Sequence, residues 1–309
     1  MTRYVVYTVD EDYWMPLYVS LYSLLCNNRD LSFEVFVLYD ERDDAFFNNV
    51  DRLEASHGDV SVEGIRVGTE TVRDAPTPHW FTEANLYRFL IGTTLPLEGE
   101  DVLYLDCDTV VDGSLEGLFE TDLEGSVAAA TPEYKLRSFE MGLPIDALFY
   151  NAGVMYIDLG LWTDHEVGSR AMDRITARDD ADFPVQEVLN PILNDRDLWT
   201  PLHPKYNAMT NWAEVLERET GDNPVVVHYT GTGKPWLYTT ERLHTDLWWE
   251  YLDGTPYRDY RPPDRTVSNW LAKGGRTIAS RSKTSVSAAL ERYSPLHETV
   301  SDAYKLLFG

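Results

Sequence analysis

Short apolar runs alternate with amphipathic segments through the first half of the chain. Runs that are apolar on both faces, separated by segments with helical spacing, are typical of a parallel sheet covered on both sides. The alternation therefore predicts an α/β fold with a Rossmann-like, mostly parallel sheet flanked by helices. The strand candidates are residues 3–9, 33–38, 60–67, 102–105, 127–131, 153–159 and 225–229, and the helix candidates are residues 15–27, 43–55 and 85–91.

The chain is strongly acidic, with 52 Asp or Glu against 26 Lys or Arg and a formal net charge of −26. Phosphate backbones are bound by clustered Lys and Arg, so this balance argues against nucleic acid as a partner. We interpret the acidic, lysine-poor composition as that of a halophile, because salt screens the self-repulsion of such a surface. Hydrophobic residues make up 43%, which is enough for a globular core.

The N-terminal residues and the cysteines indicate a compartment. Met1 is followed at once by the strand-like YVVYTV, and no apolar run reaches the length of a membrane span. We therefore expect no signal peptide and a cytoplasmic location. Cys26 and Cys107 are too few for a disulfide framework, and we interpret both as small buried hydrophobes.

The C-terminal region differs in composition from the rest. Residues 265–309 contain seven Lys or Arg against three acidic residues. We expect a main domain over residues 1–252 and an extension over 253–309, formed by a linker and an amphipathic helix. That helix either packs on the domain or tethers the protein to anionic lipid as a peripheral protein at the inner face of a membrane.

Two aspartates one residue apart end the run 102–105, in the sequence YLDCDTV. In open α/β sheets, ligands bind beyond the carboxyl ends of the strands. Residues i and i+2 of an extended strand face the same side, so we expect Asp106 and Asp108 to project together and Cys107 to point away. Such a carboxylate pair suits Mn²⁺ or Mg²⁺. The alternative is a solvated strand end, which occurs by chance in an acidic chain.

A second cluster lies in VVVHYTGTGKPW, residues 225–236. His228 follows an apolar run and is a competent Mn²⁺ ligand, while glycine amides and Lys234 are what a diphosphate needs. Taken alone, His228 would be a satisfied core histidine and the glycines an ordinary turn. Together with Asp106 and Asp108, the cluster predicts a site for one cation and a diphosphate.

Four motifs, in this order and spacing, resemble those of the retaining glycosyltransferases of family 8. That group includes bacterial lipooligosaccharide galactosyltransferases and glycogenin. The resemblance covers about residues 3–250 and implies a GT-A nucleotide-diphospho-sugar transferase fold, with residues 1–252 as the catalytic domain. It also implies a UDP-sugar donor and Mn²⁺ as cofactor, with Mg²⁺ as the alternative. The motifs are YLDCD (104–108), FYNAGV (149–154), QEVLN (186–190) and HYTGTGKPW (228–236).

The resemblance implies roles for individual residues. The metal ligands would be Asp106, Asp108 and His228. Gln186 matches the side chain beneath the reacting sugar carbon, and it joins Lys234 and Asp106 in the catalytic set. The donor-binding set would also include Asp106 and Cys107. Its other members would be Thr8, Asp10, Asp12 and Tyr13 around uracil and ribose, Arg88 close to the donor, Asn151 and Gln186 at the sugar, and Gly231 and Lys234 at the diphosphate.

Several of these residues also have structural interpretations. Arg88 would then be a surface helix residue, Tyr13 a core aromatic and Asn151 the cap of a turn. We interpret three tryptophans as core packing rather than sugar platforms, namely Trp236, Trp248 and Trp249.

One position departs from the family pattern, which reads D-Q-D where this chain has Val185, Gln186 and Glu187. The first aspartate of the pattern holds hydroxyls of a hexose. Asp182 would substitute if the loop were shaped differently, and otherwise the donor sugar differs at that hydroxyl. Donor identity stays open for this reason.

We expect retaining transfer of a galactose- or glucose-type hexose to a glycan, lipid-linked or protein hydroxyl by same-face attack. Double displacement needs a carboxylate nucleophile, and Gln186 stands at the expected position. The alternative is a non-catalytic or hydrolytic UDP-sugar-binding protein on the same scaffold. Residues 132–148 are a candidate acceptor-side loop, and the oligomeric state stays open.

Overall fold

The computed structural model describes residues 1–68, 83–133, 147–177, 185–212 and 223–270, together with Val72 and Leu143. The chain forms two compact units. The first holds residues 1–208 and 223–228, and the second holds residues 209–222 and the chain from Tyr229 onward. Asp182, most of the loop 132–148 and the expected C-terminal amphipathic helix lie outside the described residues. The catalytic boundary at residue 252 stays a prediction.

A seven-stranded sheet forms the centre of the first unit, in the order β3-β2-β1-β4-β7-β6-β8. Strands β1 to β4 pair in parallel, as do β6 and β8, whereas β7 runs antiparallel to both β4 and β6. The mostly parallel sheet is therefore confirmed, with one reversed strand at its centre. The strands are β1 (Thr2–Val9), β2 (Ser32–Tyr39), β3 (Val60–Arg66), β4 (Asp101–Leu105), β6 (Ala128–Glu133), β7 (Phe149–Asp158) and β8 (Trp199–Pro201).

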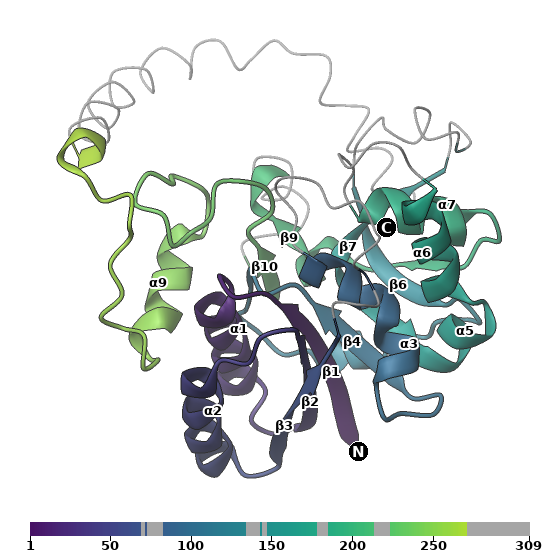
Figure 1. Ribbon diagram of the computed structural model, residues 1–309, viewed down its shortest axis with the longest axis horizontal. Helices are drawn as coiled ribbons and strands as arrows, with labels where there is room; N and C mark the ends of the chain where they lie inside the picture. The colour runs from purple at the N-terminus through teal and green to yellow at the C-terminus, as the bar shows by residue number, and fades with distance from the viewer. Residues whose placement is uncertain are drawn as a thin grey trace. The chain divides into compact units, whose positions relative to one another are not determined.

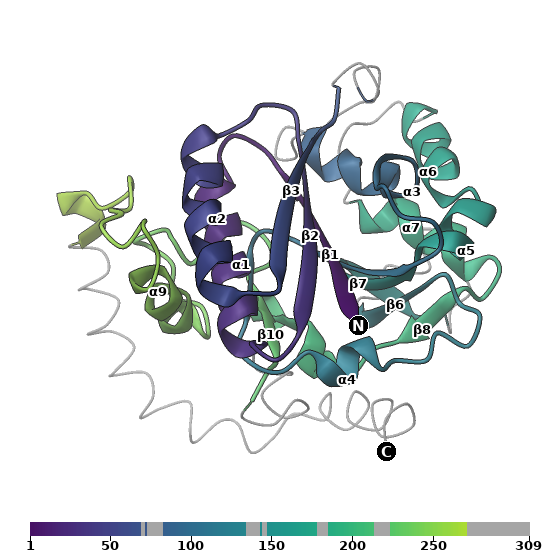
Figure 2. The same cartoon turned by 90° about the horizontal axis from the view of Figure 1, so that it is seen from below.

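Helices cover both faces of this sheet, as Figures 1 and 2 show. The expected helix over residues 85–91 is instead a 3₁₀ helix, η2, that leads directly into the short α3. Among the described residues, no helix combines the length and the apolar character needed to cross a bilayer. One face carries α1 (Trp14–Asn27) and α2 (Asp44–His57), and the other carries η2 (Glu83–Leu90), α3 (Ile91–Thr94), α5 (Leu159–Asp164), α6 (Val167–Thr176) and α7 (Gln186–Asn194).

Local signals in the sequence explain where these helices begin and end. Asp43 caps α2, because its carboxylate accepts a hydrogen bond from the amide of Phe46 at 2.9 Å. Gly58 ends the same helix with a φ of 82°, a conformation that costs glycine little. Pro16 lies in the first turn of α1, where its missing N–H has no intrahelical partner to lose. Local sequence therefore sets both ends of α2 and favours the start of α1.

A second, three-stranded sheet was not foreseen and positions the site. Its order is β5 (Thr109–Val111), β10 (Val226–His228) and β9 (Ala208–Met209). Strands β5 and β10 are antiparallel, with His228 opposite Thr109. This pairing brings the end of β10 to the residues that directly precede β5.

The second unit contains α9 (Thr245–Asp253) and a cavity of about 320 Å³. Trp248 is fully buried and contacts the rings of Trp236 and Trp249, which confirms core packing for Trp248. Trp249 stacks on Tyr260 at a centroid distance of 6.2 Å, and both rings line the cavity. None of the described residues implied by the family resemblance lines this cavity.

Candidate functional site

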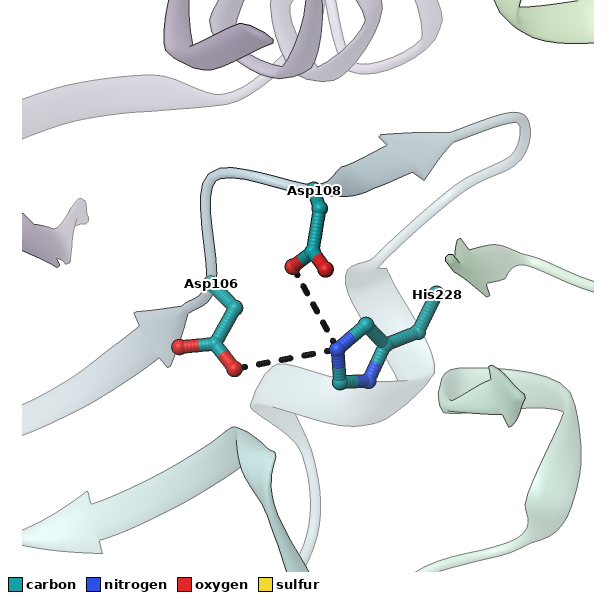
Figure 3. A group of neighbouring side chains, drawn as sticks. All are labelled: Asp106, Asp108 and His228. Atoms are coloured by element: carbon teal, nitrogen blue, oxygen red, sulfur yellow. Dashed lines mark ion pairs between the residues drawn. The ribbon is translucent and has the colours of Figure 1, made fainter. Parts of the chain in front are cut away.

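Asp106 and Asp108 lie in a turn between β4 and β5 rather than in an extended strand. The expectation that strand alternation makes them project together was therefore wrong in its geometry. Figure 3 shows the two carboxylates reaching from the turn toward one imidazole, that of His228. The residues converge because the β5–β10 pairing holds His228 beside this turn.

The three side chains could hold a metal ion. Nε2 of His228 lies 3.7 Å from Oδ2 of Asp106 and 3.4 Å from Oδ1 of Asp108, and all the ligand atoms lie within 4.8 Å of one another (Figure 3). Octahedral Mg²⁺ with bonds of about 2.0–2.1 Å places adjacent ligands about 3 Å apart. Two carboxylates and one imidazole also form a donor set that Mn²⁺ accepts. The residues present therefore fit a divalent cation.

Asp106 is held in place through its other oxygen. Oδ1 accepts hydrogen bonds from Nη2 of Arg88 at 2.9 Å and from the hydroxyl of Tyr104 at 2.8 Å. Arg88 is 3% exposed and also donates to the carbonyl of Ala152, so a surface position for it is wrong. Burial alone would lower the pKa of Arg88, but the charge of Asp106 and the Tyr104 hydroxyl outweigh this and raise it. The guanidinium thus remains charged and leaves Oδ2 aimed at His228.

The segment TVDEDY spans the end of β1 and the turn after it, and it lies partly beside these groups. Thr8 is buried, and its hydroxyl lies 3.0 Å from that of Tyr104. Burial raises the pKa of Tyr13, and the nearby charges of Asp108 and Asp10 raise it further, which places this hydroxyl in their field. Asp10 accepts a hydrogen bond from the amide of Asp12, whose own side chain is exposed. A donor-binding role for this loop stays a prediction.

The two cysteines differ. Cys107 is buried, and its thiol lies 3.1 Å from the carbonyl of Thr8, on the neighbouring strand β1. Burial raises the pKa of this thiol well above its usual range, and the charge of Asp106 adds to the effect. Cys26 is only partly buried, so the expectation that both cysteines are fully buried holds for Cys107 alone.

Asn151 on β7 and Gln186 at the start of α7 meet beside the metal ligands. Nδ2 of Asn151 donates to Oε1 of Gln186 at 3.1 Å, so Asn151 does not merely cap a turn. Asn190 is fully buried and ties α7 to β7 through two hydrogen bonds with the backbone of Tyr150. It also donates to the backbone carbonyl of Gln186, which holds the backbone of Gln186 in place.

Gly153, in FYNAGV, leaves room for the metal ligands. A Cβ built on this residue would clash with the His228 ring and lie 2.7 Å from Oδ2 of Asp106. Its amide donates to Asn151 and its carbonyl accepts from the amide of Asp106 at 2.8 Å. Glycine is required here for space, because both ligand side chains occupy the volume that a methyl group would need.

Val185 is 5% exposed and belongs to the hydrophobic core. Val188 and Leu189 of α7 belong to the same hydrophobic cluster. The position that reads aspartate in the family pattern therefore supplies packing in this chain. Asp182, the candidate substitute for that aspartate, lies outside the described residues.

Gly231 and Lys234 belong to the second unit, within which they are described. Gly231 adopts a φ of 77°, which favours glycine. Nζ of Lys234 donates to the carbonyl of Tyr229 at 3.1 Å, so the turn after β10 is closed by its own lysine. A diphosphate-binding role for these residues stays a prediction.

Two residues at the site were missed from the sequence. Glu133 ends β6, and its Oε1 accepts from Nδ2 of Asn151 at 2.6 Å and from Nε2 of Gln186 at 3.2 Å. Asn207 is fully buried and lies 2.9 Å from both Asn151 and His228. Neither stands in a motif that the sequence alone marks. Glu133 is a lone acidic residue at the end of an apolar strand, and Asn207 stands between a 3₁₀ helix and a short strand, so the sequence gives neither a clear signal.

Comparison with known proteins gives a consistent result. The family model described as Glycosyl transferase family 8 matches residues 4–240. The chain is 27% identical over 278 residues to the lipopolysaccharide 1,2-glucosyltransferase of Escherichia coli K12, covering 84% of this chain and 80% of that protein. It is also 27% identical over 257 residues to the lipopolysaccharide 1,3-galactosyltransferase of Salmonella typhimurium LT2, covering 75% and 72% of the two chains.

Among solved structures, the galactosyltransferase LgtC, crystallised with donor and acceptor sugar analogues, superposes with a TM-score of 0.73. The sequence identity is 21%, and the match covers 84% of this chain and 98% of that one. This likeness confirms the expected GT-A fold.

Proposed function

Because this chain belongs to glycosyl transferase family 8 and is therefore a glycosyltransferase, we propose that it moves a hexose from a UDP-sugar with retention of configuration. The observation that carries the proposal is the convergence of Asp106, Asp108 and His228. The hexose is of galactose or glucose type, in keeping with the relatives named above. The acceptor is a hydroxyl of a glycan, a lipid-linked sugar or a protein.

Asp106, Asp108 and His228 would hold Mn²⁺ or Mg²⁺, which neutralises charge on a departing diphosphate. Arg88 and Tyr104 hold the Asp106 carboxylate in one orientation, so that little reorganisation is needed when the donor binds. Gly231 and Lys234 would supply further diphosphate contacts. The roles of Gly231 and Lys234 follow the family resemblance alone.

In the proposed reaction, the bond between the anomeric carbon and the UDP oxygen breaks, and the acceptor oxygen bonds to that carbon on the same face. The acceptor proton passes to the departing phosphate oxygen. Both ends of the Gln186 carboxamide are hydrogen-bonded, to Asn151 and Glu133, which supports a role in holding the sugar rather than attacking it. Replacing Gln186 by Ala and finding near-normal turnover would remove it from the list of nucleophiles.

Glu133 is the carboxylate that a double displacement would use, and its substitution separates the two mechanisms. Same-face attack predicts that Glu133→Gln lowers kcat less than about tenfold, because the amide oxygen still accepts from Asn151 and Gln186. If Glu133 were the nucleophile, replacing its carboxylate by an amide would instead lower kcat by about four orders of magnitude or more. Single-turnover kinetics with the preferred UDP-sugar measure the difference. Glu133→Ala, which removes the acceptor, is expected to cost about 10–100-fold and serves as the reference.

The proposal is tested by incubating the full chain with a panel of UDP-sugars, with Mn²⁺ and after metal removal by EDTA. We expect Mn²⁺-dependent release of UDP from one or two UDP-hexoses, lost on chelation and restored by added Mn²⁺. Tight metal-dependent UDP binding with no hydrolysis or transfer would support a non-catalytic protein instead. If the protein hydrolyses UDP-sugars and transfers the sugar to none of the sugar, lipid-linked or protein acceptors offered, it would be a UDP-sugar hydrolase. If no UDP-sugar binds, the proposed function is wrong.

A further inference from the structure

We propose that Asn207 is a positioning residue that fixes the tautomer of His228 and, through Asn151, the orientation of Gln186. The inference rests on the metal site and sugar-transfer reaction proposed above. It assigns a task to a buried amide that lies between the cation ligands and the side chain expected beneath the sugar. All the residues concerned belong to the first unit.

Asn207 lies between the short 3₁₀ helix η4 (Pro204–Tyr206) and β9, and it is fully buried. Its Nδ2 lies 2.9 Å from Oδ1 of Asn151, and its Oδ1 lies 2.9 Å from Nδ1 of His228. The orientation of this buried amide is set on the Asn151 side, since flipping it would place its oxygen against the oxygen of Asn151, whereas a histidine nitrogen can either donate or accept. Which orientation holds is decided by a third residue.

The backbone amide of Gly153 decides it. This N–H lies 3.0 Å from Oδ1 of Asn151, and a backbone N–H can only donate. The Asn151 atom facing it is therefore the carbonyl oxygen, which also accepts from Nδ2 of Asn207. It follows that Asn207 presents its own oxygen to His228. One glycine amide thus sets the direction of every hydrogen bond along this path.

His228 must then carry its proton on Nδ1, because it faces the oxygen of Asn207. In the neutral ring the lone pair is then on Nε2, and this is the nitrogen that lies 3.4 Å from Asp108 and 3.7 Å from Asp106. A metal ligand of this kind needs the lone pair on the metal side and the proton on the other nitrogen. Asn207 therefore prepares His228 for a cation before any cation arrives.

The same path orients the other end of the site. With its oxygen directed to Gly153, Asn151 turns its Nδ2 toward Oε1 of Glu133 at 2.6 Å and Oε1 of Gln186 at 3.1 Å. Gln186 must then use its Nε2 to donate to Glu133, at 3.2 Å. The carboxamide of Gln186 consequently has one orientation, set by the amide that also orients the metal ligand.

Two substitutions at Asn207 separate these tasks. Asn207→Asp keeps an oxygen for the N–H of His228 but removes the donor to Asn151. Asn207→Ala removes both. Asn28→Ala is a matched control, since Asn28 is also a buried asparagine of the first unit and its side chain bonds backbone groups of Leu24, Gly113 and Leu115. It controls for a general loss of stability.

The first readout is the ¹⁵N spectrum of histidine-labelled, metal-free protein at mildly alkaline pH, with His228 assigned from a His228→Gln sample. We expect the Nδ1–H tautomer in the wild type and in Asn207→Asp, and a shift toward the Nε2–H tautomer in Asn207→Ala. An Nε2–H tautomer in the wild type would overturn the inference, whether or not the protein binds metal.

The second readout is titration with Mn²⁺ alone. We expect Asn207→Ala to bind about 10–100-fold more weakly, and Asn207→Asp and Asn28→Ala to stay within about threefold of the wild type. In Asn207→Asp, kcat for release of UDP should nevertheless fall about tenfold, with the Mn²⁺ affinity kept. Equal Mn²⁺ binding by Asn207→Ala and the wild type would refute the positioning role. A wild type that binds no Mn²⁺ would instead refute the proposed function.

Discussion

Gly153→Ala is expected to lower kcat/KM by about three orders of magnitude and to abolish the response to Mn²⁺. The added methyl group would occupy the space of the His228 ring and approach Oδ2 of Asp106 to 2.7 Å. These are two of the three proposed ligands, and neither can move aside without breaking hydrogen bonds, those of Asp106 to Arg88 and Tyr104 and that of His228 to Asn207. The methyl group would therefore separate the ligands.

Gly113→Ala is the control, because a Cβ there meets its nearest atoms at 3.5 Å, an ordinary contact. Circular dichroism should show that Gly153→Ala still folds, since the displaced atoms are side-chain ends rather than backbone. Thermal melting with and without Mn²⁺ then measures directly how much of the stabilisation by Mn²⁺ is lost. A Gly153→Ala protein with wild-type turnover and Mn²⁺ response would show that these side chains do not hold the metal.

Asp108→Asn is expected to lower kcat/KM about a thousandfold while leaving the metal-free protein as stable as the wild type or more so. Asp108 is 7% exposed, and its carboxylate lies close to that of Asp106. Without a cation, two nearby carboxylates repel, so neutralising one relieves strain in the fold. The same change removes a charged ligand, so the affinity for the cation falls.

The readout is the melting temperature at rising Mn²⁺. At a metal concentration about 100 times Kd, the wild type should gain about 2.7 kcal/mol. This corresponds to roughly 5–10 °C for a domain of this size. Asp108→Asn should gain almost nothing. Asp51→Asn, at an exposed aspartate of α2, should behave as the wild type. A full Mn²⁺-induced rise in Asp108→Asn would contradict the assignment of this ligand.

The elements that the sequence predicted well are those with a strong local period. The runs 3–9 and 33–38 became β1 and β2, and residues 15–27 became α1, because apolar spacing and caps are local properties. Strand β5 was missed since three residues carry no readable period. The antiparallel direction of β7 could not be predicted from the sequence either, because the pattern of an apolar strand does not indicate its direction in the sheet.

The convergence of three residues of the candidate site was predicted, but the geometry that produces it was not. Asp106, Asp108 and His228 meet as expected, yet through a turn and a small sheet rather than through strand alternation. Arg88 was open to a surface interpretation because a lone arginine in a helical segment gives no sign of burial. Glu133 and Asn207 were missed because their partners are distant in sequence, and hydrogen-bond networks of this kind depend on the tertiary fold.

The pairing of β5 with β10 also has a consequence for how the protein folds. It joins Thr109 to His228, far apart in the chain, through a ladder of only three residue pairs. Closing such a long loop for so few contacts is slow and entropically costly, so this ladder should form after the β1–β4 core. A cation bound at the site would then stabilise contacts that form only at the end of folding. Mn²⁺ should slow unfolding more than it speeds folding, because its ligands come together only in the last step.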